Sequence, residues 1–398
     1  MLGQYRVNIY HPRTGELQAV IEDWQRLELR RVLNGVNSAK IQLNGDHPAI
    51  PYLVNNAGIE VWRQIPGYVP SAVPAIRQRT GNWYAEWDGL FTDYSDTTYS
   101  NSNEIYNAYC DGLVDLLRRR EILWYSTPAA SESKKVAIPA QTAMYEFVEE
   151  NLGASAVAGA PGVGRLFTGT MPRMAIPLLT GGGPNWSGQR GWYNVLETLQ
   201  SIADFGAIDF DVISQGDGTW VFETYPDQLG EDRTTAGLDT TTGLNAAGNP
   251  PVIFSLELDN ISEITVSSNR SSSANIVVTV GKGEYTVRNV GYSLDLTDID
   301  GERINQREMV RSATSQDSAN ELDTFAEEWR TRLQYAEDFR FTPLITESTL
   351  YGVNYWFGDR TTGRHKDLEI DKRLTSLVII VDRNGEQFSG WNFQTIPR

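Results

Sequence analysis

Residues 27–44 read LELRRVLNGVNSAKIQLN, and this stretch decides the fold class. Asn34 and Gly35 sit between two alternating segments, and both residue types tolerate a positive φ, so the pair is a strong hairpin signal. The returning segment places Ala39, Ile41 and Leu43 on one face and Ser38, Lys40, Gln42 and Asn44 on the other. The stretch therefore predicts an antiparallel hairpin.

Short strands surround this hairpin on both sides. The alternating or β-branched segments are Gln4–Tyr10, Leu17–Trp24, Gly58–Gln64 and Trp83–Tyr94. Five or more strands in about 100 residues favour a small antiparallel barrel or sandwich. We therefore expect an N-terminal β-barrel-like domain over residues 1–110.

The next region, residues 111–255, mixes helix and strand signals. Apolar residues at helical spacing predict helices over Gln141–Asn151 and Trp192–Phe205. A hairpin is expected from Ala207–Ile213 to Trp220–Tyr225, with a long loop over 154–191 before it. This pattern predicts an α+β middle domain with long loops.

Strands resume in the last region, residues 256–398. Candidate strands are Val252–Leu258, Ile261–Ser267, Asn275–Gly281 and Glu284–Val290, and a helix is expected over residues 318–335. A second Asn-Gly pair, Asn384-Gly385, joins closing strands at 374–381 and 388–393. The fold class we predict is α+β and mainly β, with two antiparallel β-barrel-like domains flanking the α+β middle region.

Composition excludes several classes of protein. The 398 residues include 51 acidic and 34 basic side chains, a net charge of −17, which argues against sequence-independent nucleic-acid binding. No run approaches the ~20 apolar residues of a membrane span, and the N-terminus lacks a secretion-signal pattern. Cys110 is the single cysteine, so no internal disulfide framework is expected. Arg outnumbers Lys by 28 to 6, which reflects either nucleotide bias or the preference for Arg at protein interfaces.

The sequence lacks complete motifs for binding cofactors or metals and for nucleophilic catalysis. Histidine occurs only at His11, His47 and His365, each in a turn or loop pattern, and no Gly-x-Ser-x-Gly elbow is present. The glycines of 159–164 lack dinucleotide spacing. The acidic loop 298–302 resembles a calcium loop, but that alignment places Leu296 and Arg307 at ligand positions. We predict no catalytic, cofactor or metal site, and no cofactor.

One set of carboxylates could still do chemistry. Asp209 and Asp211 alternate on one strand, and Glu223 lies on the partner strand. Three carboxylates on one sheet face could form a glycosidase acid/base pair. The alternative interpretation, which we favour, is the solvated side of a two-faced hairpin.

Three groups of segments, taken in order, resemble the tail hub (baseplate hub) proteins of tailed bacteriophages, including the siphophage versions. They are Arg31–Asn44 with Gly58–Trp62 and Trp87–Phe91; Leu199–Gly206 with Gly230–Thr234; and Phe357–Arg360 with the closing strands. The resemblance implies a structural, non-enzymatic homotrimer whose subunits each give two barrel-like domains. Three copies would then present a pseudo-sixfold ring to the tail tube.

The resemblance also implies partners and a location. The expected partners are tail tube and distal tail proteins, tail-tip, fibre or spike proteins, and the tape measure protein, in a virion tail tip assembled in the host cytoplasm. DNA would only pass through the lumen, and we expect acidic lumen walls, which do not hold it. Because the sequence ends at Arg398 just after the closing strands, we expect no appended hydrolase.

Two other functions stay open. The first is a carbohydrate-binding or glycoside-hydrolysing tail-tip protein, with Trp83, Trp87, Trp186 and Trp192 as a stacking platform. The second is a receptor-binding protein at the tail tip, because it would share the β-rich composition.

Overall fold

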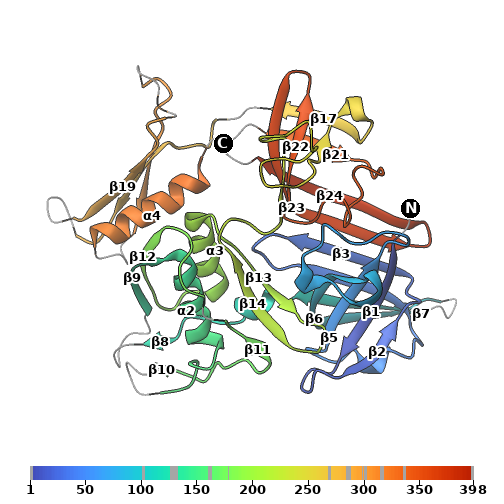
Figure 1. The fold of residues 1–398 in the computed structure, drawn as a ribbon. Coiled ribbons are helices and arrows are strands. Elements are labelled where there is room, and N and C mark those ends of the chain that lie inside the picture. The colour runs from blue at the N-terminus through green and yellow to red at the C-terminus, as the bar shows by residue number, and fades with distance from the viewer. Residues whose placement is uncertain are drawn as a thin grey trace.

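The computed structural model describes most of the chain, and it is mainly β (Figure 1). The described residues are 3–100, 104–125, 133–159, 164–177, 179–267, 270–283, 288–297, 299, 303–313, 318–334 and 338–395. The predicted class, α+β and mainly β, is confirmed.

A twelve-stranded sheet dominates the fold and draws strands from both ends of the chain. Its N-terminal strands are β1 (Gln4–Tyr10), β2 (Leu17–Ile21), β3 (Arg26–Val32), β4 (Ser38–Asn44), β5 (Gly58–Gln64), β6 (Tyr84–Thr98) and β7 (Glu104–Gly112). Its later strands are β15 (Asp232–Arg233), β16 (Ile253–Phe254), β22 (Arg360–His365), β23 (Leu368–Asp382) and β24 (Gly385–Thr395). The order is β15-β22-β23-β3-β4-β7-β6-β5-β1-β2, with β16 on β22 and β24 on β23.

Both Asn-Gly hairpins are confirmed. β3 and β4 pair antiparallel with Leu27 opposite Ile41, and both side chains are buried. Asn34 takes a φ of 52°, the left-handed value that favours Asn or Gly in a tight turn. At the other end of the chain, β23 and β24 meet with Asp382 opposite Gly385.

The expected closure into two barrels is wrong in the part of the chain that the structure describes. Closing the N-terminal strands would require β3 to pair with β2, the other end of their path. The free edge of β3 pairs instead with β23, where Leu29 lies opposite Ile379. Strands from the two ends of the chain therefore belong to one sheet, and the N-terminal strands follow one another in a different order from the C-terminal strands. The domain division at 110 and 255 stays a prediction.

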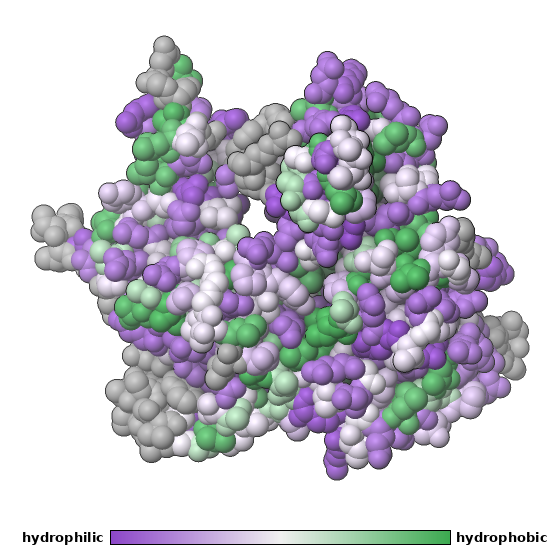
Figure 2. Space-filling model, in the orientation of Figure 1, coloured by the Kyte–Doolittle hydropathy of each residue, from purple (hydrophilic) through white to green (hydrophobic). Residues whose placement is uncertain are grey.

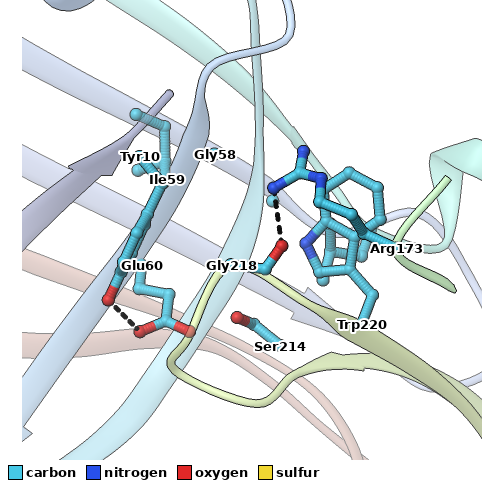
Figure 3. A pocket seen from close by; sticks show the side chains of 10 residues that line it. Tyr10, Gly58, Ile59, Glu60, Arg173, Ser214, Gly218 and Trp220 are labelled. Carbon is cyan, nitrogen blue, oxygen red and sulfur yellow. Dashed lines mark hydrogen bonds between the residues drawn. The ribbon is translucent and has the colours of Figure 1, made fainter. Parts of the chain in front are cut away.

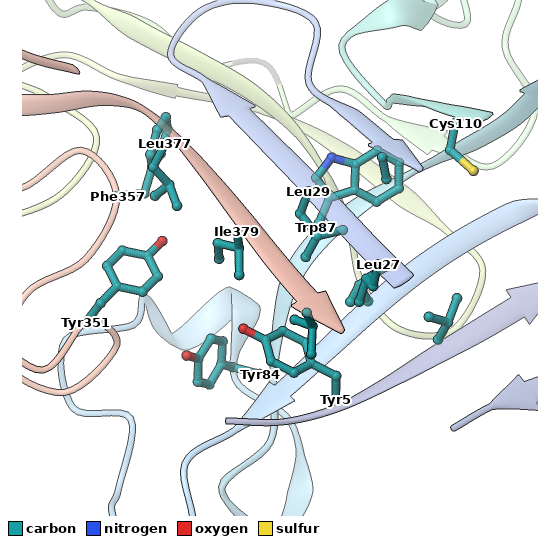
Figure 4. Close-up of a cluster of buried hydrophobic side chains, with 14 of the residues drawn as sticks. Tyr5, Leu27, Leu29, Tyr84, Trp87, Cys110, Tyr351, Phe357, Leu377 and Ile379 are labelled. Atoms are coloured by element: carbon teal, nitrogen blue, oxygen red, sulfur yellow. The ribbon is translucent and has the colours of Figure 1, made fainter. Parts of the chain in front are cut away.

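One aromatic-rich core follows from this pairing. Leu27 and Leu29 of β3 lie beside Leu377 and Ile379 of β23, as Figure 4 shows. The same cluster extends through large buried rings on strands and loops of both ends: Tyr84, Trp87, Phe254, Phe339, Phe341, Tyr351, Tyr355 and Trp356. Each Å² of apolar surface buried in this core contributes roughly 25 cal/mol to the free energy of folding. This burial is the main contribution that holds the N-terminal and C-terminal strands together.

A second core holds the middle region. Its elements are α1 (Asp115–Arg118), β8 (Trp124–Tyr125), β9 (Ser133–Pro139), α2 (Ala140–Leu152), β10 (Gly164–Arg165), β11 (Met174–Ala175), β12 (Asn185–Arg190), α3 (Val195–Gly206), β13 (Asp209–Ser214) and β14 (Trp220–Tyr225). Helices α2 and α3 match the two predicted helices. The Asn194 side chain caps α3 by accepting a hydrogen bond from the Leu196 amide at 3.0 Å. Phe210 and Phe222 from the β13–β14 hairpin share this second core with both helices.

The third region contains a helix-covered sheet and a separate strand pair. The sheet joins β18 (Ile276–Val280), β19 (Val290–Leu294) and β20 (Glu308–Ser312) beneath α4 (Ala319–Arg332), and β17 (Ile261–Ser267) pairs with β21 (Asp338–Pro343). The predicted strand 252–258 ends at Phe254, and a 3-10 turn, η4 (Leu256–Leu258), follows, closed by Asp259 at φ 50°. Of the predicted strand 284–290, residues 284–287 lie outside the described residues.

Candidate functional site

The three candidate carboxylates do share one face of the β13–β14 hairpin. Asp211 lies directly opposite Glu223, and Asp209 lies two residues earlier on the same strand. The face is not solvated, however, which corrects the interpretation we favoured: Asp209 is 4% exposed and Asp211 is 6% exposed. The reason is that this face packs against the large sheet, while the opposite face packs on α2 and α3.

Asp211 is held by a buried arginine that also binds the large sheet. Arg77 ends a short 3-10 turn and lies 2.7 Å from an Asp211 oxygen and 3.2 Å from an oxygen of Asp88 on β6. Asp88 in turn accepts a hydrogen bond from the Ser214 amide at 2.7 Å. Arg77, Asp88 and Asp211, here called the Arg77 joint, thus tie β13 to β6.

Burial sets the protonation of this joint. Burial raises the pKa of Asp211, and Arg77 acts in the opposite direction. Burial by itself lowers the pKa of Arg77, but the two carboxylates more than offset this effect, so its pKa lies above the ordinary value. A buried arginine between two carboxylates is a structural bridge rather than a proton donor.

Asp209 is equally committed to structure. It accepts hydrogen bonds from the Asn34 side chain at 3.0 Å and from the Leu229 amide at 2.6 Å, and it pairs with Arg373 of β23. The side-chain oxygen of Asn34 also accepts a hydrogen bond from the Phe210 amide at 2.9 Å. Both contacts bind the turn of the first hairpin to β13. Glu223 is half-buried, and burial raises its pKa.

This arrangement does not fit glycoside hydrolysis. The reaction requires two carboxyl groups that flank a substrate bond, one as acid and one as nucleophile or base. Asp209 and Asp211 instead bind arginines and backbone amides inside the protein. What the geometry achieves is a rigid contact between the middle region and the large sheet.

The four tryptophans do not form a platform. Trp87 belongs to the first core and Trp186 to the second, where its indole nitrogen donates to Glu328 at 2.9 Å. Trp83 is half-buried beneath the guanidinium of Arg6. Trp192 alone of the four is exposed.

The remaining candidates also lie apart. His11 accepts backbone hydrogen bonds within its own turn, His47 binds Asp23 at 2.9 Å, and His365 ends β22. Among the described residues, no group of His, Cys, Asp or Glu could hold a metal ion, and no helix is long and apolar enough to cross a membrane. Residues 298 and 300–302 of the acidic loop, and 160–163 of the glycine loop, lie outside the described residues.

Two of the cavities are unlike substrate sites. A small one, between β5 and the β13–β14 hairpin, has a volume of about 10 Å³, room for about one water, and the Tyr10–Glu60 and Arg173–Gly218 hydrogen bonds join residues of its lining (Figure 3). A larger hollow of about 730 Å³ lies where α3 and α4 face β3 and β23, and Figure 2 shows the molecule open there. Its lining is mostly polar, with Asn34, Gln200, Asp204 and Arg332 among its residues, whereas ligand pockets are mostly apolar.

Comparison with known proteins identifies the family of the chain. A family model described as Siphovirus ReqiPepy6 Gp37-like protein matches residues 6–393. The chain belongs to this Gp37-like family. No curated protein matches the sequence.

Solved structures are similar to this Gp37-like chain along nearly its whole length. The 43 kDa tail protein of prophage MuSo2 from Shewanella oneidensis is 11% identical, with a TM-score of 0.54 over 99% of this chain and 98% of that chain. A tail protein from Neisseria meningitidis is 11% identical, with a TM-score of 0.48 over 98% and 96% of the two chains. A chain of the lidded Francisella PdpA–VgrG complex is 8% identical, with a TM-score of 0.50 over 99% of this chain and 55% of that chain.

The resemblance to phage tail proteins is thereby confirmed. The family is siphoviral, and the fold is that of a prophage tail protein. Sequence reasoning missed the residues that hold the Gp37-like fold together, above all Arg77 and Arg373, because Arg77 lies in a 3-10 turn and Arg373 lies just before the predicted closing strand 374–381. The one available signal was the excess of arginine, the residue best suited to buried ion pairs.

Proposed function

We propose that the chain is a structural tail hub protein, three copies of which form a ring that joins the tail tube to the tail tip. The observation that carries this proposal is the whole-length match, in family and in fold, to phage tail proteins. The buried state of Asp209 and Asp211 adds support, because both carboxylates are committed to ion pairs with arginines inside the protein. The hub acts through its shape and contacts and not as an enzyme.

In this proposal DNA passes through the ring without binding to its wall. The net charge of −17 supports this, since an acidic wall repels the phosphate backbone and offers no counterion release. The ring would contact tail tube and distal tail proteins on one side and tail-tip, fibre or spike proteins on the other, with the tape measure protein at the lumen. The protein would assemble in the host cytoplasm and remain in the virion at the tail tip.

Light scattering coupled to gel filtration tests the trimer. The expected mass is three times the 44.5 kDa of the chain. A stable monomer that persists when tail tube protein is added would contradict the proposal. Gold-labelled antibodies on intact virions test the location: the hub predicts label at the tail axis, and label on peripheral fibres would indicate a receptor-binding protein instead.

The non-enzymatic role has its own test. Glu223→Gln removes the half-buried carboxylate of the candidate set with little change in shape. The proposal predicts unchanged infectivity and no clearing of peptidoglycan by either the wild type or the variant. Clearing by the wild type that the variant lacks would reveal a hydrolase.

A further inference from the structure

The sheet formed by β18, β19 and β20 has one covered face and one open face. Val277 and Thr279 point toward α4, and the Thr279 hydroxyl donates to the Leu322 carbonyl at 2.7 Å. The alternate residues of the three strands point away from the helix. On that side the apolar residues are Ile276, Val278, Val280, Val290, Tyr292, Leu294 and Val310, which we call the sheet patch.

The sheet patch is more apolar than a solvent-facing sheet normally is. Tyr292 is 61% exposed and Val310 is 63% exposed, and they lie on either side of Val278 in the register. Val290 and Leu294, the other patch residues of β19, are 49% and 39% exposed. This sheet is mixed, since β18 pairs antiparallel with β19 and parallel with β20. A sheet face that meets water is usually polar, and contiguous apolar surface marks a contact with another molecule.

A second exposed apolar group lies elsewhere on the chain. It comprises Leu256 and Leu258 in η4 and Leu344 and Ile345 just after β21, and we call it the corner patch. The two segments are held together by the hydrogen bond from the Leu344 amide to the Asn260 carbonyl at 2.8 Å. Exposed aliphatic side chains from two segments thus share one corner of the fold.

The two patches lie on opposite flanks and carry opposite charges nearby. Figure 1 places β19 at the left of the molecule and β17, next to η4, at the upper right. The described charged residues close to the strand ends beside the sheet patch are mainly basic, namely Lys282, Arg288, Arg303 and Arg307, with Asp295 and Glu308 as the acidic exceptions. Those beside the corner patch are acidic: Glu257, Asp259, Glu263 and Glu347. The patches are therefore complementary to each other, and neither is complementary to itself.

We infer that the sheet patch of one copy binds the corner patch of the next copy, and that this head-to-tail contact closes the ring. The inference rests on the proposed trimer and names its contact surfaces. Different surfaces on the two sides of a contact form a heterologous interface, which repeats around a rotation axis until the ring closes. Apolar centres with charged rims are also the usual composition of such interfaces.

Single substitutions at exposed positions test the contact. Val310→Glu in the sheet patch and Leu258→Glu in the corner patch each place a charge in the apolar centre. Val69→Glu is the matched control, because Val69 is 62% exposed and Val310 is 63% exposed. By light scattering, the wild type and the control should have three times the mass of one chain, and both patch variants should fall to one chain while their far-UV circular dichroism spectra stay those of the folded protein.

The outcomes separate this inference from the proposed function. A trimeric wild type with trimeric patch variants would overturn the patch contact and leave the hub proposal standing. A monomeric wild type would overturn the trimer and the contact together. Loss of the trimer in Val69→Glu as well would show that the effect is unspecific and would also overturn the assignment.

Crosslinking gives the direction of the contact. The protein offers a clean background because Cys110 is buried and burial raises the pKa of its thiol, which keeps it unreactive. A chain carrying both Val310→Cys and Leu258→Cys should form covalent dimers and trimers with a short bismaleimide, and each single-cysteine chain should stay monomeric on a denaturing gel. Efficient dimer formation by Val310→Cys alone would show that the sheet patch meets its own copy and would overturn the head-to-tail arrangement.

Discussion

The substitution Arg77→Met tests whether the Arg77 joint holds the middle region on the large sheet. Arg77 is 2% exposed, and its guanidinium lies between Asp88 and Asp211, which are 3% and 6% exposed. Methionine keeps much of the side-chain volume but removes the positive charge. Two buried carboxylates then face each other without a cation.

The expected loss follows from the burial of all three groups. Removing one partner of a buried ion pair destabilises a protein by about 3–5 kcal/mol, because the remaining charge is left unpaired. Asp88 keeps its hydrogen bond from the Ser214 amide and Asp211 keeps one from the Val212 amide, so neither carboxylate loses every partner. We expect a loss of about 3 kcal/mol in the free energy of unfolding at pH 7.

Urea unfolding followed by tryptophan fluorescence measures this loss. The control is Arg26→Met: Arg26 pairs with Glu28 at 3.2 Å, as Arg77 does with Asp88, but both side chains are about 40% exposed. Such surface pairs contribute under about 1 kcal/mol. The reasoning is refuted if Arg77→Met and Arg26→Met cost the same.

The pH dependence provides a second check on the same variant. Burial already raises the pKa of Asp211 above its ordinary 3.8, and loss of the arginine raises it further. A carboxyl with a raised folded-state pKa destabilises the protein when ionised, and this penalty shrinks as the pH falls toward the unfolded-state pKa. The gap between variant and wild type should therefore narrow from pH 7 to pH 4, and a gap that widens would contradict the account.

Three further substitutions test separate parts of the fold, the first two by urea unfolding and the third by amide hydrogen exchange. Gly89→Ala places a methyl group against the Trp87 indole and the Asp111 carbonyl oxygen, and should lower the free energy of unfolding by about 2 kcal/mol. An unchanged free energy would show that the strand can shift to make room. Phe254→Ala empties a site among Phe341 and other rings of the first core and should lower it by about 4 kcal/mol, while a loss below about 1 kcal/mol would refute the importance of this cluster. Ser318→Ala removes the capping box of α4 and should speed amide exchange in its first turn, consistent with a loss of about 1 kcal/mol; unchanged exchange would contradict the cap.

Local patterns were enough to predict the hairpins and helices. The Asn34-Gly35 and Asn384-Gly385 pairs each mark a turn between two strands, and the apolar spacing after Asn194 marks α3 within a few residues. These elements are set by neighbours in the sequence, through turn conformation and helix periodicity. These hairpins and helices form in the same way whichever other elements pack against them.

The same local patterns could not predict which other segments pack against these elements. Asp209 and Asp211 alternate as solvated residues do, yet arginines from distant segments bury both. The pairing of β3 with β23 joins residues that lie about 350 positions apart, and the buried ion pair from Arg63 to Glu386 at 2.6 Å lies beside it in the same core. Alternation tells which residues share a face, and only tertiary contacts tell what that face meets.

Electron microscopy of the purified protein tests the central claim most directly. Averages of single particles should show threefold rings with a continuous opening wide enough for a DNA duplex, and labelled sheet and corner patches should meet at each contact between neighbouring copies. Particles of a single chain, or rings whose centre is filled by protein, would contradict a hub through which DNA passes.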